Sequence, residues 1–294
     1  MFVLAHLTDP HIGPLPAPRL ADLLGKRALG FINWRRKRGA IHRTDVLDAI
    51  VGDLKAHAYD HLAVTGDLIN IALEAEFEPA RAWLESLGAP DDVTLVPGNH
   101  DTYVRATATQ ALRDWGAYMR GDDLESFPFV RRRGPVALIG LSSALPTPPF
   151  MATGRLGGDQ LARLDTALAA LGREGAFRVV LIHHPPVSKP SRYFKRLTDS
   201  AELRSVLRKN GAELLIHGHD HVRNLVWLDG PKAPIPALSA PSASAIANGT
   251  DEPAAYNLFE IDGKAGAWRC TMIARGFSRS GDKITELTRQ ALAS

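Results

Sequence analysis

The stretch from Val93 to Asp101 reads VTLVPGNHD, a short apolar run that ends abruptly in a polar cluster. The same change recurs along the chain, and the runs are rich in Val, Ile and Leu with little alternation. This composition is typical of strands that are buried on both faces. The sequence therefore predicts buried strands at each of these places. The other runs are Phe2–Leu7, His61–Val64, Val136–Leu141, Val179–Ile182 and Leu214–Ile216.

Helical spacing of apolar residues separates these runs and predicts an α/β fold, because strand–helix alternation builds βαβ units. The expected helices are Thr44–His57, Glu74–Leu87, Asp159–Leu171 and Ser200–Lys209. After about residue 222 the long helical patterns stop, and we expect a strand-rich region at about 222–275 that forms a second sheet. A short helix is predicted at Thr285–Leu292.

Composition limits the class of protein. The 294 residues are 45% hydrophobic and 23% charged, which predicts a folded chain, and we expect a single domain over 1–294. The net charge of +3 is too small for a general nucleic-acid binder. Cys270 is the only cysteine, so an internal disulfide and a cysteine-based zinc site are excluded. The first residues predict a strand and not a signal peptide, and we expect a cytoplasmic protein.

Seven side chains that can bind metal ions follow the predicted strands. In open α/β sheets, ligand sites form at the carboxyl ends of strands. Carboxylate, amide and imidazole ligands without a thiolate suit Mn²⁺, Fe or Zn²⁺ better than Ca²⁺ or Mg²⁺, and seven of them can hold two ions. A shared carboxylate would place the ions about 3.5–4 Å apart. The seven are Asp9, His11, Asp67, Asn99, His183, His219 and His221.

Five short motifs in order resemble the calcineurin-like metallophosphoesterases over about residues 1–222. The family pattern is D-x-H, G-D, G-N-H-D/E, a lone His, and G-H-x-H. The resemblance implies a four-layer αββα sandwich with two mixed β-sheets and a metal site at the C-terminal ends of the strands. In this chain the motifs are Asp9-Pro10-His11, Gly66-Asp67, Gly98-Asn99-His100-Asp101, His183 and Gly218-His219-Asp220-His221.

The resemblance also implies a role for each residue. Asp9, His11 and His221 would bind one metal. Asn99, His183 and His219 would bind the other, with Asp67 as the bridge. His100 would assist the leaving group during in-line attack by a metal-bridging hydroxide on a phosphodiester. The chain is most similar to the small bacterial class III phosphodiesterases, whereas Asn70 departs from the G-D-x-x-D-R-G pattern of the protein phosphatases.

Two alternatives concern neighbouring histidines. His184 could take the place of His183, although His183 is the first polar residue after its apolar run. His217 lies in strand alternation with His219, but the Gly-His-x-His pattern favours His219. We expect His42, which belongs to no motif, to be a surface or capping residue.

A basic amphipathic segment at about 19–38, RLADLLGKRALGFINWRRKR, lies outside the family pattern. It predicts a solvated surface helix, a lid over an anionic substrate, a homodimer contact or a peripheral helix on anionic lipid at the inner membrane face. A second basic-aromatic stretch, 192–196, should share the same rim. The expected substrate-binding residues are Arg35, Arg36, Arg192 and Lys195.

These features favour a phosphodiesterase that acts on a small-molecule or lipid phosphoester. The basic segment motivates an alternative, a membrane-surface hydrolase of a lipid phosphodiester or pyrophosphate. A non-catalytic binding module on the same fold is the remaining alternative, and the complete ligand set with His100 argues against it.

Overall fold

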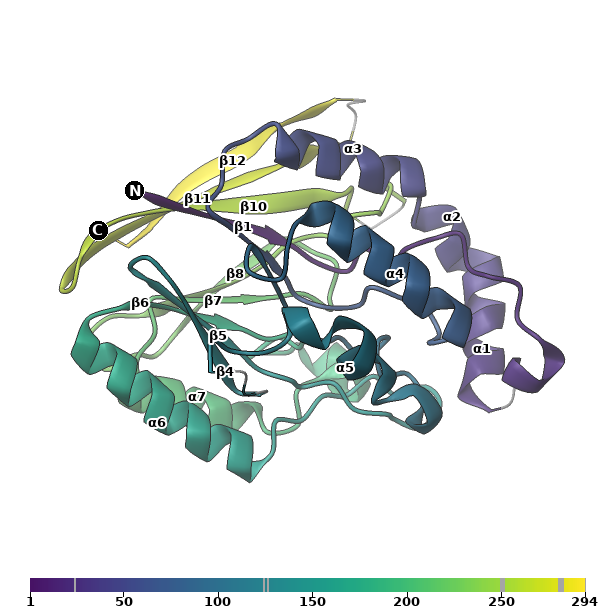
Figure 1. The fold of residues 1–294 in the computed structure, drawn as a ribbon, viewed down its shortest axis with the longest axis horizontal. Coiled ribbons are helices and arrows are strands. Elements are labelled where there is room, and N and C mark those ends of the chain that lie inside the picture. The colour runs from purple at the N-terminus through teal and green to yellow at the C-terminus, as the bar shows by residue number, and fades with distance from the viewer. Residues whose placement is uncertain (24, 124, 126, 249–251, 280–282, 294) are drawn as a thin grey trace.

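In the computed structural model, which describes all residues except 24, 124, 126, 249–251, 280–282 and 294, two six-stranded β-sheets stack between helices (Figure 1). The first sheet has the strand order β12-β11-β10-β1-β2-β3, and the second has the order β4-β5-β6-β7-β9-β8. Each sheet contains parallel and antiparallel pairs. The predicted four-layer αββα sandwich with two mixed sheets is confirmed.

The strands that carry the polar clusters are neighbours within each sheet, and the strand before Asn99 is the edge strand of the first sheet. The first sheet contains β1 (Phe2–Leu7), β2 (His61–Val64), β3 (Val93–Leu95), β10 (Ala255–Lys264), β11 (Ala267–Phe277) and β12 (Ile284–Ala293). The second contains β4 (Phe129–Arg133), β5 (Val136–Gly140), β6 (Phe177–Leu181), β7 (Leu214–His217), β8 (Asn224–Leu228) and β9 (Ile235–Ser239). Because β1, β2 and β3 are parallel, as are β5, β6 and β7, their carboxyl ends meet at one edge of the sandwich.

Helices cover the outer faces of the two sheets (Figure 1). The helices on the side of the first sheet are α3 (Thr44–Lys55), α4 (Glu74–Leu87) and α5 (Gln110–Trp115). Those on the second sheet are α6 (Gly158–Glu174) and α7 (Ser200–Asn210). Short 3₁₀ turns complete the connections at η1 (Leu20–Leu23), η3 (Arg105–Thr107), η4 (Gly116–Tyr118) and η5 (Pro190–Lys195).

Alternate residues of the central strands face two different apolar layers. On β5 and β6, Leu138 and Val179 pack into the core between the sheets, whereas Ile139 and Val180 pack under α6 and α7. Both faces are therefore buried, since strand side chains alternate with period two. This is why these runs are continuously apolar in the sequence.

The C-terminal part of the chain differs from the prediction. The helix expected at Thr285–Leu292 is wrong, because β12 pairs antiparallel with β11 there, with two irregularities in register. An open sheet edge supplies hydrogen-bond partners that override a local helical pattern. The strand-rich region also divides: β8 and β9 join the second sheet, whereas β10 and β11 extend the first.

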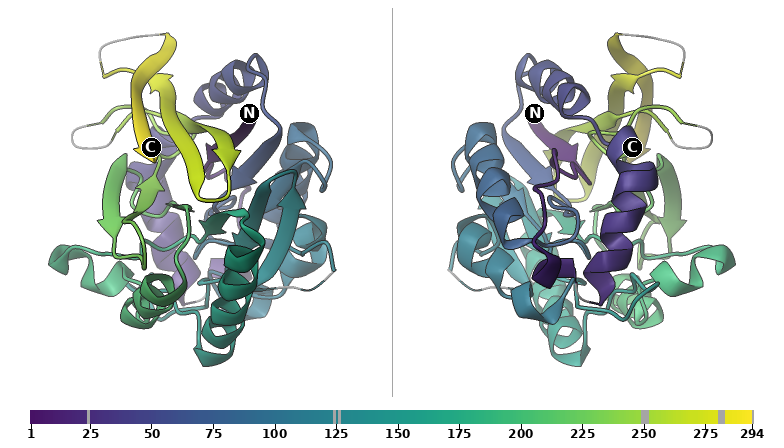
Figure 2. Two further views of the ribbon diagram at one scale, coloured as in Figure 1. Left: turned by 90° about the vertical axis from the view of Figure 1, so that its left-hand side faces the viewer. Right: turned by 90° about the vertical axis from the view of Figure 1, so that its right-hand side faces the viewer.

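The basic segment is largely helical. α1 (Lys26–Asn33) continues through a π-helical turn, η2 (Trp34–Arg38), into α2 (Gly39–Ile41). This helix runs along the surface in the right-hand view of Figure 2, on the side toward which β1 points in Figure 1. Among the described residues, every helix is too short or too polar to span a bilayer.

Candidate metal centre

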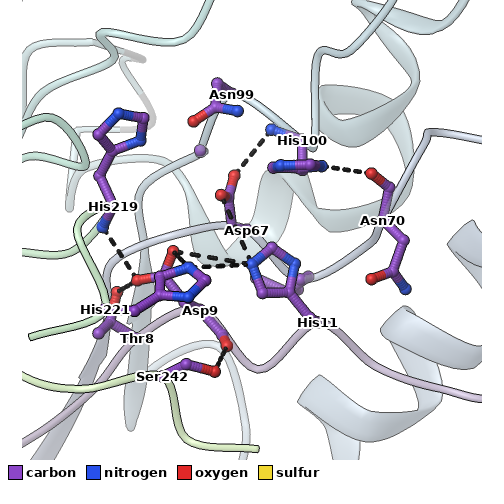
Figure 3. Close-up of polar contacts among 12 residues, drawn as sticks. Thr8, Asp9, His11, Asp67, Asn70, Asn99, His100, His219, His221 and Ser242 are labelled. Atoms are coloured by element: carbon purple, nitrogen blue, oxygen red, sulfur yellow. Dashed lines mark hydrogen bonds and ion pairs between the residues drawn. The ribbon is translucent and has the colours of Figure 1, made fainter. Parts of the chain in front are cut away.

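The seven predicted ligands meet at the shared edge of the two sheets. Asp9 and His11 follow β1, Asp67 follows β2, and Asn99 follows β3. The remaining three come from the second sheet: His183 follows β6, and His219 and His221 follow β7. Figure 3 shows the side chains of Asp9, His11 and Asp67 pointing toward one another.

The loops that carry these residues have a backbone conformation that is rare outside glycine. Seven non-glycine residues in the described part of the chain have positive φ, and five of them are predicted ligands. Such strain concentrates at functional sites, where it aims side chains that ordinary turns would direct elsewhere. The five are Asp9, His11, Asp67, His219 and His221, with φ between 40° and 76°.

One ligand group consists of Asp9, His11, Asp67 and His221, whose ligand atoms lie within 4.8 Å of one another. Nε2 of His11 lies 3.2 Å from Nε2 of His221, which in turn lies 3.1 Å from Oδ1 of Asp9. Ligands arranged tetrahedrally around an ion at about 2.1 Å are separated by about 3.4 Å. These spacings therefore fit a single ion between the four side chains.

A second group shares Asp67 with the first. Asp67, His183 and His219 form this group, and Oδ2 of Asp67 lies 3.4 Å from Nε2 of His183. Nε2 of His183 also lies 3.2 Å from Oδ1 of Asn99 and 3.2 Å from Nδ1 of His219. Asp67 therefore occupies the position that a bridging carboxylate requires.

Hydrogen bonds on the outer side of the imidazoles fix the orientation of the rings. Nδ1 of His11 donates to the carbonyl of Ile69 over 3.2 Å, and Nδ1 of His183 donates to the carbonyl of Thr65 over 2.7 Å. Nε2 is thus the nitrogen of each ring that faces the centre, as is usual for metal-binding histidines. Asp101 holds the loop beneath them, since its carboxylate accepts from the backbone N–H groups of Asp67, Leu68 and Gly98.

Both carboxylates of the ligand groups have lowered pKa values. Burial alone would raise the pKa of Asp67, but the imidazoles of His183 and His100 hold it well below its usual range. Burial likewise opposes ionisation of Asp9, whose pKa is nevertheless lowered by His221. Two buried anions need positive charge between them. The donor set therefore fits divalent cations.

His100 lies beside the centre without joining either ligand group. Its backbone N–H donates to Oδ1 of Asp67 over 2.7 Å, and its Nδ1 donates to the carbonyl of Asn70 (Figure 3). Its Nε2 accepts a hydrogen bond from Nη1 of Arg38 over 2.8 Å. Burial and the Arg38 charge lower the pKa of His100 to about 3.

A cavity of about 550 Å³ opens over the centre. Its lining includes the predicted substrate-binding residues Arg192 and Lys195, whereas Arg35 and Arg36 lie outside it. The basic residues that the helix supplies to the lining are Lys26, Lys37 and Arg38. Arg38 is half-buried and also donates to Nε2 of His11 over 2.7 Å.

The alternative histidines lie in neither ligand group. Both nitrogens of His184 have partners, since Nδ1 lies 2.8 Å from Oγ of Ser143 and Nε2 lies 3.1 Å from the carbonyl of Ala152. His217 ends β7 and is buried, with Nδ1 3.2 Å from the carbonyl of Gly218. The structure thus brings His183 and His219 to the centre and leaves these two beside it.

Sequence reasoning missed two residues next to the centre. His42 is the C-cap of α2, as the capping alternative predicts. It is also buried and contacts His11, with ring centroids 4.5 Å apart, so the surface alternative is wrong. Arg38 contacts His11 and His100. The available signal was the spacing of Trp34, Arg38 and His42, since residues four apart share a helix face.

Comparison with known proteins is consistent with this geometry. The model of the calcineurin-like phosphoesterase family matches residues 2–223, and the chain belongs to this family. It is therefore a metal-dependent phosphoric ester hydrolase, and the expected family is confirmed. A relative from Synechococcus sp., described as a probable cyclic nucleotide phosphodiesterase, is 28% identical over 229 residues, which cover 75% of this chain and 79% of the relative.

Solved structures share the fold at low identity. A dimetal phosphatase from Danio rerio has a TM-score of 0.63 at 14% identity, covering 99% of this chain and 98% of that one. A purple acid phosphatase from yellow lupin (Lupinus luteus) seeds has a TM-score of 0.64 at 12% identity, covering 97% of this chain and 52% of that one. These similarities show the αββα architecture.

Proposed function

We propose that the protein is a phosphodiesterase with a dinuclear centre that hydrolyses a small-molecule phosphodiester. The observation that carries the proposal is the pair of ligand groups that share Asp67. Two ions on one carboxylate lie about 3.5–4 Å apart, which suits the attacking and leaving oxygens of an in-line displacement. The description of the Synechococcus relative supports a diester substrate.

The ligand set favours Mn²⁺, Fe or Zn²⁺, because it combines imidazole and carboxylate groups. Asp9, His11 and His221 would hold one ion, and Asn99, His183 and His219 the other. Bound there, divalent ions supply Lewis-acid charge to the phosphoryl oxygens and lower the pKa of a water so that it can attack.

Arg38 and His100 are proposed to bind and orient the phosphate. The guanidinium of Arg38 can donate two parallel hydrogen bonds to phosphate oxygens, a geometry that a lysine does not offer. Lys26, Arg192 and Lys195 line the same cavity, and their combined charge attracts an anionic ester.

His100 is proposed to assist the leaving oxygen from Nε2. Its Nδ1 is committed to the carbonyl of Asn70, so Nε2 is the nitrogen available to the cavity. A phosphodiester anion beside this nitrogen favours the imidazolium and raises the pKa of His100, opposing the effect of Arg38. The ring could then donate its proton to the oxygen that departs.

A substrate panel with the Mn²⁺-loaded protein tests this function. The panel contains bis-p-nitrophenyl phosphate, p-nitrophenyl phosphate, cyclic nucleotides, glycerophosphodiesters and UDP-linked lipids. We expect diesters to be hydrolysed with a higher kcat/KM than the monoester, and Asp67→Ala to abolish turnover. A preference for the monoester would overturn the diesterase proposal, and a lack of turnover on every compound would favour the binding-module alternative.

A second candidate function is hydrolysis of a lipid phosphodiester or pyrophosphate at a membrane surface. It is favoured by exposed apolar side chains around the basic helix and the cavity: Leu20, Leu29, Ile32, Phe150 and Phe194. Phe150 lines the cavity, is 85% exposed and has a φ of 66°. Basic and apolar side chains at one rim suit an anionic headgroup with an attached chain.

A further inference from the structure

His42 lies directly against the first ligand group. One ring nitrogen from each of His11, His42 and His221 lies within 4.8 Å of the others. The His42 ring centroid is 4.5 Å from that of His11 and 5.5 Å from that of His221. This trio contains neither carboxylate, so His42 adjoins the proposed first ion on the side of its two imidazoles.

The backbone around His42 is held by the loop that passes under the centre. Arg43 N–H donates to the carbonyl of Ser244 over 2.9 Å, and Ile246 N–H donates to the carbonyl of Ile41 over 3.0 Å. The ring of Trp34 lies parallel to that of His42, at 8° and a centroid distance of 6.3 Å. The imidazole is thus fixed from both sides before any ion binds.

A chain of serine hydroxyls accommodates His42 with its proton on Nδ1. The hydroxyl of Ser242 donates to the carbonyl of Asp9 over 2.6 Å, and Oγ of Ser244 lies 3.3 Å from Oγ of Ser242. Nδ1 of His42 lies 2.9 Å from Oγ of Ser244. If Nδ1–H donates to Ser244 and Ser244 donates to Ser242, each group donates one hydrogen bond. The series then ends at the carbonyl of Asp9, which can only accept.

This tautomer leaves a lone pair on Nε2 of His42. None of the described residues forms a hydrogen bond with that nitrogen, and the side chain is only 6% exposed. The rings of His11 and His183 are held in the same way, with Nδ1 bonded outward to a backbone carbonyl and Nε2 toward the centre. Outer partners of this kind orient imidazoles that bind metals.

We infer that His42 is an additional imidazole ligand of the ion held by Asp9, His11, Asp67 and His221. The inference rests on the metal centre of the proposed function and adds a ligand from outside the five family motifs. A third nitrogen at this ion strengthens the preference for Zn²⁺, Fe or Co²⁺ over Mg²⁺ and Ca²⁺. The basic helix would then be joined to the centre through the metal itself.

Metal affinity and proton NMR of the Co²⁺-loaded protein test the inference. A histidine bound to Co²⁺ gives a strongly shifted, exchangeable Nδ1–H signal. We expect one such signal of the wild-type protein to vanish in His42→Ala, and the affinity for one of the two ions to fall by roughly 10–100-fold or more. An unchanged set of shifted signals together with unchanged affinity would overturn the inference.

Ser244→Ala is the second variant, because it keeps the ring and removes the nearer of the two hydroxyls beside Nδ1, with Ser242 Oγ at 3.3 Å as the other. We expect the same signal to shift and its N–H to exchange faster with solvent, and an unaltered signal would contradict the assignment. Circular dichroism of both metal-free variants checks that they fold. Wild-type protein that binds one ion would contradict the dinuclear function, whereas two ions without any effect of His42→Ala would contradict only the role of His42.

Discussion

Nη1 of Arg38 donates a hydrogen bond to Nε2 of His100 over 2.8 Å. The basic helix therefore reaches His100, although the two residues belong to different parts of the sequence. Because Nδ1 of His100 donates to Asn70, the ring accepts from Arg38 as a neutral imidazole. A phosphate that enters the cavity meets a charged donor and a neutral ring side by side.

Arg38→Ala should lower kcat/KM for phosphodiesters by about 10–100-fold, since a hydrogen bond to a charged group contributes about 1.5–3 kcal/mol. Arg38→Lys should recover only part of this, because an ammonium cannot make the bidentate contact. Steady-state kinetics at fixed metal loading measures both, with Arg81→Ala on the exposed face of α4 as the control. An equal or larger loss of kcat/KM in Arg35→Ala or Arg36→Ala would instead indicate that the outer residues of the helix bind the phosphate.

His100→Ala should keep its metal but lose kcat by about 10²–10⁴ if the ring is a general acid. The loss should be smaller for p-nitrophenyl esters, because p-nitrophenolate needs little protonation to leave. Parallel elemental analysis and kinetics on esters with good and poor leaving groups provide the measurement. Loss of metal in this variant would place His100 among the ligands.

Asp67→Ala should lose both ions, because its carboxylate lies in both ligand groups. Asn99→Ala should mainly weaken one ion, since Asn99 contacts His183 of the second group alone. Elemental analysis of dialysed protein gives the stoichiometry, with two ions per chain expected for the wild type. A wild-type protein that is active with one ion would contradict the bridge.

A partly buried charge cluster away from the site should make stability depend on pH. The carboxylate of Asp53 accepts from Nε of Arg275 over 2.9 Å and from the hydroxyl of Tyr256 over 2.6 Å, which joins α3 to β10 and β11. Burial opposes ionisation, but the hydrogen bond from Arg275 lowers the pKa of Asp53. A folded-state pKa below the unfolded-state pKa of about 3.9 contributes stability at pH values above about 3.9. This contribution is lost as the pH falls through the folded-state pKa.

Asp53→Ala should therefore reduce the free energy of unfolding by about 1.5–3 kcal/mol at pH 7. The difference from wild type should shrink below about pH 4. Asp48→Ala, an exposed position on the same helix, is the matched control and should change stability by less than about 0.5 kcal/mol. Urea unfolding at pH 7 and pH 3.5 provides the comparison, and a difference that does not depend on pH would refute the charged pairing.

If the basic helix rests on a membrane, Leu29→Ser combined with Ile32→Ser should weaken co-sedimentation with anionic liposomes. Both side chains are exposed on α1, and an apolar face adds to the electrostatic attraction of such a helix. Neutral liposomes are the control, since basic residues contribute about 1 kcal/mol each only at an anionic surface. The membrane candidate would be excluded if the wild-type protein sedimented to the same extent with anionic liposomes, with neutral liposomes and without liposomes.

Much of the fold follows from local sequence because the strands that lead to the site are buried on both faces. The apolar runs before Asp9, Asp67 and Asn99 therefore predict strands, and the polar residues after them mark the shared edge. The predicted helix at Glu74–Leu87 has the same bounds as α4, since its apolar spacing is regular over the whole length. Here the local pattern and the tertiary packing agree.

Prediction from the sequence fails where the contacting residues come from distant parts of the chain. β12 is a strand because β11 offers it an edge, which no property of Ile284–Ala293 alone predicts. The positions of Arg38 and His42 depend on a helix outside the family pattern that docks over His11. Such residues become visible only when the three-dimensional neighbours of His11 are known.

Turnover of bis-p-nitrophenyl phosphate by the metal-loaded protein tests the central claim most directly. The account predicts hydrolysis that depends on added Mn²⁺ or Zn²⁺, stops with a chelator and is absent in Asp67→Ala. It also predicts a higher kcat/KM than for p-nitrophenyl phosphate under the same conditions. Turnover that persists in Asp67→Ala, or no turnover after full loading with two ions, would contradict the account.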